Sequence, residues 1–484
     1  MARAGVPVRR AAGDGAHLLP TLGDRAAVRH QCEEHPDRGA ARGIDRARDR
    51  PRGGRADVRV GSHGGEDGAG RGDRAADRVP RRAAGCDLAR MNTEVIVVGA
   101  GPSGSTAARE IAARGHEVLL LDRARFPRDK PCGGGVTVRC ANLLPFSIEP
   151  VVEDVVTHAW LRVRNGRDIE RNAGGVLTYM TQRRRLDAFL VERAQEQGVQ
   201  FRDGQTVTSV QRLGDGTYEV RTRDDVHTAR VVIGADGANG IVANRLGYDG
   251  IPDGAAALEG NLPYPDGVPA RFRGRVVLNF GYVPGGYGWV FPKGDHVNVG
   301  VGGWKHAAGP RLRAALNHLC ALYGLDADRI EGLRGHTLPM AQPGMTIAAQ
   351  GSAVIGDAAG LVDPLSGEGI YAALASGVAV APAAADYLDG VTGDLGGYQA
   401  TMAREMLGEN RASAALLEIF QAAPDPFIWL MQHSGAFWDG ACRLVRGDAT
   451  YEGLTYVLGA PMHALLGPTS AIARRVNDRR HPRR

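Results

Sequence analysis

The chain has 484 residues, a formal net charge of +5 and 43% hydrophobic residues. The positive charge lies in residues 1–90, which hold nineteen Arg, whereas residues 91–484 carry 40 Lys and Arg against 41 Asp and Glu. This balance gives no support for nucleic-acid binding. No apolar run reaches the length needed to cross a membrane, so an integral membrane protein is not expected. The four cysteines after residue 90 have neither metal-site nor disulfide-framework spacing, which fits a reduced cytoplasmic protein.

Residues 1–90 also contain no Lys, Phe, Tyr or Trp and no persistent hydrophobic period. Such a segment cannot bury enough apolar surface to offset the entropy of ordering it. We expect a disordered leader, with the functional protein starting at Met91. The alternative is a basic arm for nucleic acid or a membrane, and the interspersed Asp and Glu argue against it. The remaining 394 residues are too many for one core, so we expect two intertwined domains.

The first predicted elements surround a glycine motif. An apolar strand over 95–98 runs into Gly99, Gly101 and Gly104, an Ala-rich helix extends to about residue 114, and a strand over 117–121 ends at Asp122. Here Gly99 permits a tight turn, Gly101 lets backbone approach a pyrophosphate, and Gly104 lets helix and strand pack closely. The helix N-terminus attracts phosphate, and Asp122 can accept from a ribose hydroxyl. The segment predicts a dinucleotide site.

Two later segments favour FAD over NAD as the dinucleotide. Residues 231–239 predict a buried strand and a glycine turn that contains Asp236. Residues 353–370 predict another strand, followed by Asp357 and a helix entry at Gly367 and Gly369. Asp357 lies past the strand's carboxyl end and can accept from ribityl hydroxyls, or it is a plain helix N-cap. Bare N–H groups at the two glycines can stabilise negative charge on a reduced flavin.

At these residues the chain resembles the FAD-dependent oxidoreductases with the para-hydroxybenzoate hydroxylase fold, over about 93–390. Within them, residues 126–136 and 287–302 resemble the geranylgeranyl reductase family. The resemblance implies an α/β fold with a Rossmann-like FAD-binding domain (91–250 and 341–390). An antiparallel-sheet substrate domain (251–340) would be intertwined with it, and a helical region with a basic tail (391–484) would follow.

The same resemblance implies a set of cofactor contacts and no metal. Arg183 matches an arginine that opens a helix beside the cofactor, although in a run of three arginines a solvated helix start is the alternative. The implied FAD-binding residues are Gly99, Gly101, Gly104, Asp122, Arg123, Cys132, Gly133, Arg183, Asp236, Asp357, Gly367 and Gly369.

The region 251–340 shows the short, partly alternating runs of an antiparallel meander. Tyr287, Trp289 and Phe291 alternate, so their rings share one face of a strand. Such a wall suits a long branched hydrocarbon or an ordinary sheet core, and the resemblance favours the hydrocarbon. Lys293, one of three lysines in the chain, is expected to pair with a diphosphate or to be solvated at a turn. Cys132 either faces the flavin and the alkene or is a small buried side chain.

After about residue 391 the chain turns helical, with apolar clusters at 427–431, 437–438 and 451–458. These clusters are expected to cap the pocket or to rest on a bilayer surface. Six Arg against one Asp from Arg474 onward suit an anionic leaflet or simply form a solvated terminus. The expected location is the cytoplasm, with peripheral contact at the inner face of the membrane.

These observations lead to a functional hypothesis. The protein would be an FAD-dependent reductase that saturates C=C bonds of a geranylgeranyl or other isoprenoid chain, in a lipid, a quinone tail or a diphosphate. Hydride would come from N5 of the reduced flavin, NADPH or ferredoxin would be the external reductant, and Cys132, Tyr287 or a bound water would donate the proton. A monooxygenase (hydroxylase) or halogenase on the same fold is the alternative. A flavin-binding protein without turnover is disfavoured by three complete cofactor segments.

Overall fold

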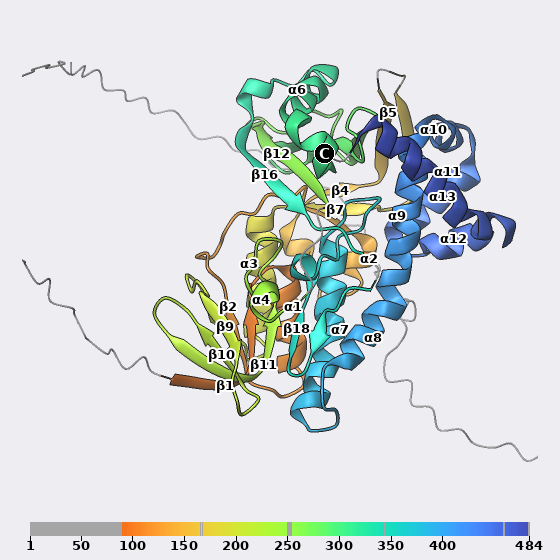
Figure 1. Cartoon of the computed structure of the whole chain (residues 1–484). Helices are drawn as coiled ribbons and strands as arrows, with labels where there is room; N and C mark the ends of the chain where they lie inside the picture. Colours follow the sequence, from red (N-terminus) through yellow and green to blue (C-terminus); the bar gives the residue numbers. More distant parts are fainter. Residues whose placement is uncertain are drawn as a thin grey trace, which may run out of the picture. The chain divides into compact units, whose positions relative to one another are not determined.

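The computed structural model describes residues 90–482, apart from 165, 167, 249–253, 343 and 458–459. Residues 1–89 of the predicted leader lie outside the described residues, and Arg90 is the first residue of strand β1. The described chain forms an α/β fold with two large sheets and a helical C-terminal region (Figure 1), which confirms the predicted fold class.

The first sheet has a parallel centre with strand order β17-β18-β11-β1-β2-β8, extended by the antiparallel strands β10 and β9. Residues Val95–Val98 of its central strand are buried, because helices α1 (Pro102–Ala112) and α7 (Ile370–Leu388) pack on one face and strands β9 and β10 with the short helix α4 (Val242–Arg245) pack on the other, and this explains their continuous apolar run. The strands are β1 (Arg90–Val98), β2 (Val118–Leu121), β8 (Gln200–Arg202), β9 (Ser209–Arg212), β10 (Tyr218–Arg221), β11 (Val226–Gly234), β17 (Ala348–Ala349) and β18 (Ser352–Val354).

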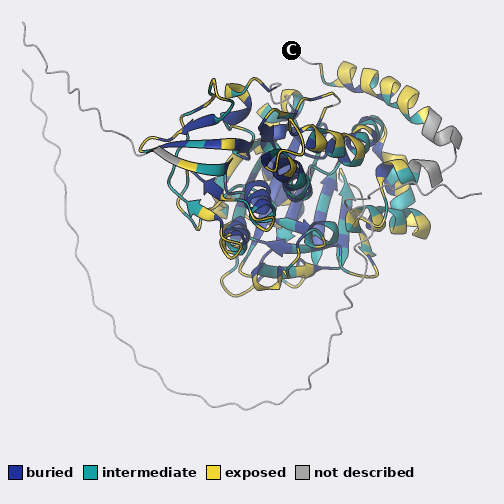
Figure 2. Ribbon diagram, turned by 90° about the horizontal axis from the view of Figure 1, so that it is seen from below, coloured by how far each residue is buried: buried dark blue, intermediate teal, exposed yellow. Residues whose placement is uncertain are grey.

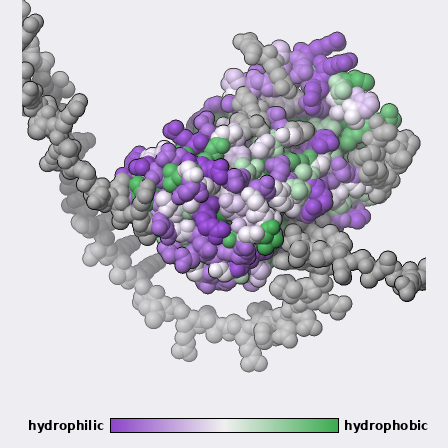
Figure 3. Space-filling view, turned by 60° about the horizontal axis from the view of Figure 1, so that its bottom comes forward, coloured by the Kyte–Doolittle hydropathy of each residue, from purple (hydrophilic) through white to green (hydrophobic). Residues whose placement is uncertain are grey.

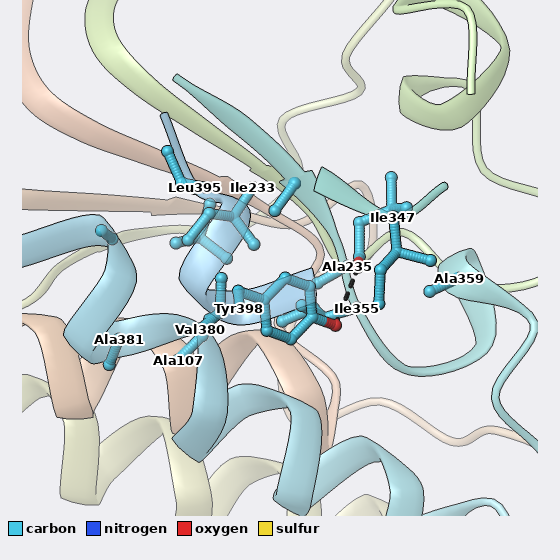
Figure 4. Close-up of a cluster of buried hydrophobic side chains, with 14 of the residues drawn as sticks. Ala107, Ile233, Ala235, Ile347, Ile355, Ala359, Val380, Ala381, Leu395 and Tyr398 are labelled. Carbon is cyan, nitrogen blue, oxygen red and sulfur yellow. Dashed lines mark hydrogen bonds between the residues drawn. The ribbon is translucent and has the colours of Figure 1, made fainter. Parts of the chain in front are cut away.

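Helices α1 (Pro102–Ala112), α3 (Arg183–Gln195) and α7 (Ile370–Leu388) accompany this sheet. The backbones of α1 and α7 approach closely, since a Cβ at Gly377 would lie 2.7 Å from the carbonyl oxygen of Ser103. Small side chains such as Ala107 fill the contact, and Figure 4 shows this cluster with Tyr398 of α8 (Gly396–Met402).

Helix α7 corrects one prediction. Its 19 residues are long and apolar enough to cross a membrane by length and composition, contrary to the expectation that no run reaches that length. It is the single described helix that passes this test, and 67% of it is buried inside the protein. It is therefore packed as a core helix.

The second sheet has the order β16-β12-β15-β14-β13-β5-β6 and is antiparallel except for the parallel pair β13 and β5. Helix α6 (Leu312–Leu322) covers one face, against Val290, Val299 and Val301. The strands are β5 (His158–Val163), β6 (Ile169–Asn172), β12 (Ala255–Pro263), β13 (Arg275–Phe280), β14 (Tyr287–Pro292), β15 (His296–Trp304) and β16 (Glu331–Leu338).

One strand pairing crosses the predicted domain boundary at this sheet. Strands β5 and β6 lie inside the segment 91–250, which the sequence assigned to the FAD-binding domain, yet they pair with β13 in the second sheet. A third sheet, made of β3 (Gly135–Thr137), β7 (Thr178–Thr181) and β4 (Val152–Val156), follows the glycine loop at 133–135. The short helix α2 (Val138–Ala141) continues from β3.

The C-terminal region is helical, as predicted after residue 391, with a π-helical turn at Ala403–Leu407. Its helices α9, α10 and α11 cover the face of the second sheet opposite α6, so that Phe420 and Ile428 pack near Leu161 and Val276. In α10 and α11 several outward-facing residues are exposed, whereas Arg411 is the single exposed residue of α9. Figure 2 shows the exposed outer side of the helix that precedes the C-terminus. The helices are α9 (Gly408–Ala422), α10 (Pro424–His433), α11 (Gly435–Arg446), α12 (Tyr451–Val457) and α13 (Ala460–Arg480), and the short helices elsewhere are α4 (Val242–Arg245) and α5 (Lys305–Ala308).

Candidate functional site

The first glycine turn has the geometry that its spacing predicts. Gly99 has a positive φ of +103°, and a Cβ there would lie 2.3 Å from the carbonyl oxygen of Ala235. A Cβ at Gly104 would lie 1.8 Å from the carbonyl oxygen of Gly99. Both positions therefore bring α1, β1 and the end of β11 closer together than any side chain allows.

Gly101 differs from its neighbours, because its bare backbone faces two cations. A Cβ there would meet the guanidinium nitrogens of Arg128 at 3.7 Å and of Arg183 at 3.9 Å. Arg183 is buried and pairs with Asp187 through bonds of 2.7 and 2.8 Å, and Arg128 reaches the same carboxylate at 2.8 Å. Two guanidinium groups beside the N-terminus of α1 form a site for an anion.

Of the three adjacent arginines, Arg183 alone is buried, whereas Arg184 and Arg185 are exposed. The position at the first turn of α3 turns its side chain toward the Gly101 turn. This placement argues against the alternative of a solvated helix start for Arg183.

The other predicted groups at the carboxyl ends of the strands lie nearby. Asp122 is buried at the end of β2 and accepts from the backbone N–H of Ala100 and of Ala124, both at 2.8 Å. Asp236 follows β11 and accepts from the N–H groups of residues 241 and 242, so its carboxylate closes a local turn. Arg123 is exposed and acts on Asp236 through its charge.

The third segment places Asp357 beside the entry into α7. A Cβ at Gly369 would lie 3.3 Å from its carboxylate, so the two positions share one space. The Lys130 ammonium lies 3.1 Å from the Asp357 carboxylate, and the His336 ring lies 3.9 Å from the same carboxylate. Burial raises the pKa of Asp357, but the Lys130 ammonium and the neighbouring His336 side chain outweigh it and hold the pKa below its usual range. Asp357 is thus an ionised acceptor and not merely a helix N-cap.

The residues at these three turns fit FAD. A dinucleotide needs cations for its pyrophosphate, acidic acceptors for its sugar hydroxyls and open backbone beside its ring. The Gly101 turn with two guanidinium groups, the carboxylates of Asp122 and Asp357, and the positive-φ turn at Gly367 supply these features. The described residues contain no group of three or more His, Cys, Asp or Glu that could hold a metal ion.

The aromatic side chains of β14 form one wall, as their alternation predicts. Ring centroids of Tyr287 and Trp289 are 6.0 Å apart, and those of Trp289 and Phe291 are 6.1 Å apart. The indole N–H of Trp289 donates to Asn298 at 2.8 Å, which fixes the ring. Tyr287 continues the wall through Phe280, whose ring lies 5.8 Å away, toward the C-terminal helices.

Tyr287 connects this wall to the third cofactor segment. Its hydroxyl donates to the carbonyl oxygen of Ser366, and a Cβ at Gly367 would lie 3.7 Å from the same hydroxyl. Burial raises the pKa of Tyr287 above its ordinary value. The hydroxyl is therefore suited to holding the loop rather than to releasing a proton.

Cys132 and Gly133 lie against the other end of the wall. A Cβ at Gly133 would lie 2.9 Å from the ring of Phe291, so no side chain fits there. Cys132 is half-buried, and its sulfur accepts from the N–H of Gly134 at 3.4 Å. The four described cysteines are free thiols, in line with the absence of a disulfide framework.

The structure contradicts the alternative that Lys293 is solvated at a turn. Its side chain is 4% exposed, and its ammonium donates to the carbonyl oxygen of Gly133 at 2.7 Å. The same ammonium lies 3.7 Å from the sulfur of Met180, so it is enclosed by the protein.

Several residues of the site were not singled out from the sequence. Lys130 and Arg128 lie in the segment 126–136 that resembles the geranylgeranyl reductase family, so their positive charge in that segment could have indicated a role in the site. Glu368 lies between Gly367 and Gly369. Its carboxylate accepts from the Thr137 hydroxyl at 2.8 Å and from the Arg139 guanidinium, so this loop is bonded to the start of α2. His336 comes from a distant strand and gave no signal.

Comparisons with known proteins agree with this geometry. A family model described as an FAD binding domain matches residues 92–261. A geranylgeranyl diphosphate reductase of Rhodobacter capsulatus is 35% identical, over 62% of this chain and 76% of the relative. A menaquinone reductase of Mycolicibacterium smegmatis is 34% identical, over 59% of this chain and 75% of the relative.

Solved structures show the same fold. A geranylgeranyl bacteriochlorophyll reductase-like protein from Thermoplasma acidophilum has a TM-score of 0.62 at 20% identity, over 80% of this chain and 100% of that chain. A flavin-dependent brominase has a TM-score of 0.63 at 18% identity, over 80% and 100%. At such identities the likeness extends to the fold alone.

The fold and the three cofactor segments, with the FAD-binding family match, define an FAD-dependent oxidoreductase. The identities of the relatives and the shares of their lengths that are covered identify the family within this class. The chain belongs to the geranylgeranyl reductase family.

Proposed function

We propose that this protein saturates C=C bonds of an isoprenoid chain carried by a lipid, a quinone tail or a diphosphate. The observation that carries the proposal is the contact between the aromatic wall and the cofactor loop, through the Tyr287 hydroxyl and the Ser366 carbonyl oxygen. The wall offers a large apolar area, which a branched hydrocarbon needs and a small polar substrate does not. Two relatives named above reduce geranylgeranyl diphosphate and menaquinone by their names, and both carry isoprenoid chains.

Bound and reduced FAD would supply a hydride to the substrate. Gly101, Arg128, Arg183, Asp122 and Asp357 would hold it. An isolated alkene is not electrophilic, so the second carbon needs a proton as the hydride arrives, and water must be excluded from the reacting carbons.

The protein contributes exclusion and alignment. Trp289 is 8% exposed, and its ring is fixed by the hydrogen bond to Asn298. The middle of the wall would therefore offer the isoprenoid chain a rigid surface that is shielded from water. Cys132 remains the candidate proton donor beside the wall, together with a bound water, because Tyr287 is committed to Ser366. Each reduction adds one hydride and one proton across a C=C bond.

An anaerobic assay tests the proposal. Protein reduced with dithionite is incubated with geranylgeranyl diphosphate and, separately, with menaquinone, and products are read by mass spectrometry. Gain of two hydrogens per bond without oxygen supports reduction. A strict need for oxygen with gain of an oxygen atom or a halogen would instead establish the hydroxylase or halogenase alternative.

The proposal extends to the reductant and the location. NADPH or ferredoxin would dock transiently, and the protein would act in the cytoplasm at the inner face of the membrane. Exposed apolar side chains occur on α10, α11 and α13, among them Trp429, Val445, Leu465 and Ile472, and α13 also carries Arg474, Arg475, Arg479 and Arg480. Figure 3 shows hydrophobic patches within a largely hydrophilic surface. Sedimentation with vesicles of phosphatidylglycerol against phosphatidylcholine tests this contact.

A further inference from the structure

Helix α9 is bonded to the backbone on both sides of the site. The hydroxyl of Ser413, a fully buried side chain, accepts from the N–H of Leu365 at 3.0 Å, just before the cofactor glycines. Further along the same helix, the amide oxygen of Gln421 accepts from the N–H of Gly285 at 3.0 Å, in the turn that leads into β14. One helix therefore holds both the cofactor loop (residues 363–369) and the start of the aromatic wall.

Tyr287 joins these two attachment points on their other side. It is the first residue of β14, directly after the turn that Gln421 holds, and its hydroxyl donates to the carbonyl oxygen of Ser366 in the cofactor loop. Helix α9, the cofactor loop and the start of β14 thus form a closed ring of hydrogen-bonded segments. A shift of the loop away from the wall has to break a bond in this ring.

The turn before β14 is fixed by packing as well as by Gln421. A Cβ at Gly285 would lie 2.1 Å from the ring of Trp304, and a Cβ at Gly286 would lie 1.8 Å from a backbone carbonyl oxygen of β15. The ring of Phe420, the neighbour of Gln421, lies 5.4 Å from that of Phe280. Helix α9 is therefore held against the wall by both apolar and polar contacts.

The cofactor loop has a second attachment to the C-terminal helices. The hydroxyl of Tyr451, at the start of α12, donates to the carboxylate of Asp363 at 3.3 Å. The backbone N–H of Tyr451 in turn donates to the carboxylate of Glu409 on α9. Helix α9 therefore holds the loop directly through Ser413 and indirectly through α12.

We propose that Ser413 and Gln421 are positioning residues through which α9 sets the place of the aromatic wall relative to the cofactor loop. Both bond backbone groups, so their effect on the chemistry is alignment. The inference rests on the proposed function, because reduction requires an alkene on the wall to stay aligned with the flavin. The coupling between wall and loop exists with or without turnover.

Hydrogen exchange on the FAD-loaded full chain tests the coupling without relying on activity. Gln421→Met removes the amide group at similar side-chain length, so exchange at Gly285 should rise about two- to ten-fold, the effect of one lost hydrogen bond. Exchange at Gly367, on the far side of the ring, should rise about two-fold or more. Gln421→Glu keeps the accepting oxygen and should restore the protection of both amides.

Ser413→Ala should raise exchange at Leu365 and Gly367 by about two- to ten-fold. Ser434→Ala is the matched control, because the Ser434 hydroxyl accepts from a backbone N–H at the N-cap of α11, at 3.2 Å. It loses the same kind of bond and should leave the cofactor loop unchanged.

A rise confined to the turn in Gln421→Met, with Gly367 unchanged, overturns the proposal. Gln421 is half-buried near the end of α9, so this variant is expected to fold and decides the question even if Ser413→Ala does not fold.

Kinetics with geranylgeranyl diphosphate then separate alignment from binding. Gln421→Met should lower kcat about ten-fold and leave KM within about two-fold, because misplacement acts on the chemical step. An unchanged kcat in this variant would overturn the positioning role. A wild type that shows the coupling and reduces no isoprenoid would refute the proposed function and leave the coupling of wall and loop standing.

Discussion

Replacement of Gly101 by Ala separates cofactor binding from folding at the first glycine turn. The nearest atoms that a Cβ would meet are the guanidinium nitrogens of Arg128 and Arg183, at 3.7 and 3.9 Å, which are ordinary van der Waals contacts. The backbone at this helix N-cap has φ −76° and ψ −176°, a conformation that Ala adopts without strain. The folded chain can therefore accept the methyl group. The same methyl group would keep a phosphate from approaching the backbone of the turn.

The expected magnitudes follow from this geometry. Gly to Ala stabilises by about 0.4–1 kcal/mol through the unfolded chain, and loss of the glycine N-cap offsets roughly that amount. The free energy of unfolding of the apoprotein should change by less than about 0.5 kcal/mol. Loss of a charge-assisted phosphate contact costs about 1.5–3 kcal/mol, which raises the Kd for FAD roughly ten- to a hundred-fold.

Urea unfolding of the apoprotein and a fluorescence titration with FAD measure the two quantities. Gly214→Ala is the neutral control, because no atom lies within 4 Å of its Cβ position. Gly104→Ala is the positive control for folding, because its Cβ would lie 1.8 Å from the Gly99 carbonyl oxygen and should cost about 1–3 kcal/mol or more. An unchanged Kd for Gly101→Ala would show that the pyrophosphate does not lie at this turn.

Three further outcomes are expected. Trp289→Ala should weaken isoprenoid turnover while bound-flavin absorbance persists, and loss of the flavin would show that β14 is scaffold for the cofactor. Asp357→Asn should raise the Kd for FAD about ten-fold, since the ionised acceptor beside Lys130 is lost, and an equal titration curve would contradict its role. Between pH 8 and 10.5 the unfolded chain keeps the Lys293 proton that the folded chain releases, so the free energy of unfolding should rise with pH by up to about 1.4 kcal/mol per unit. Lys293→Met should flatten this rise in urea unfolding, and a slope equal to that of wild type would show that the buried ammonium is not destabilised.

The sequence was informative wherever a local rule applied. The glycine spacing predicts close backbone approach, and the structure shows it at Gly99 and Gly104, because a missing Cβ acts on its immediate neighbours. The alternation of Tyr287, Trp289 and Phe291 likewise placed three rings on one face, since side chains of any strand alternate.

Questions that depend on long-range packing had no such rule. The choice of Arg183 among three arginines, the burial of Lys293 and the pairing of β5 with β13 depend on segments far apart in the chain. Composition gives the charge of a residue and not its partner, so the pairing of Lys130 with Asp357 and the bond from Lys293 to Gly133 emerged only from the fold.

By itself, then, the sequence determined the cofactor class and the order of the strands, turns and helices around the glycine segments, because both depend on residues close together in the chain. The tertiary structure decided which charges are buried together, because their desolvation and pairing depend on neighbours that folding alone brings within a few ångströms.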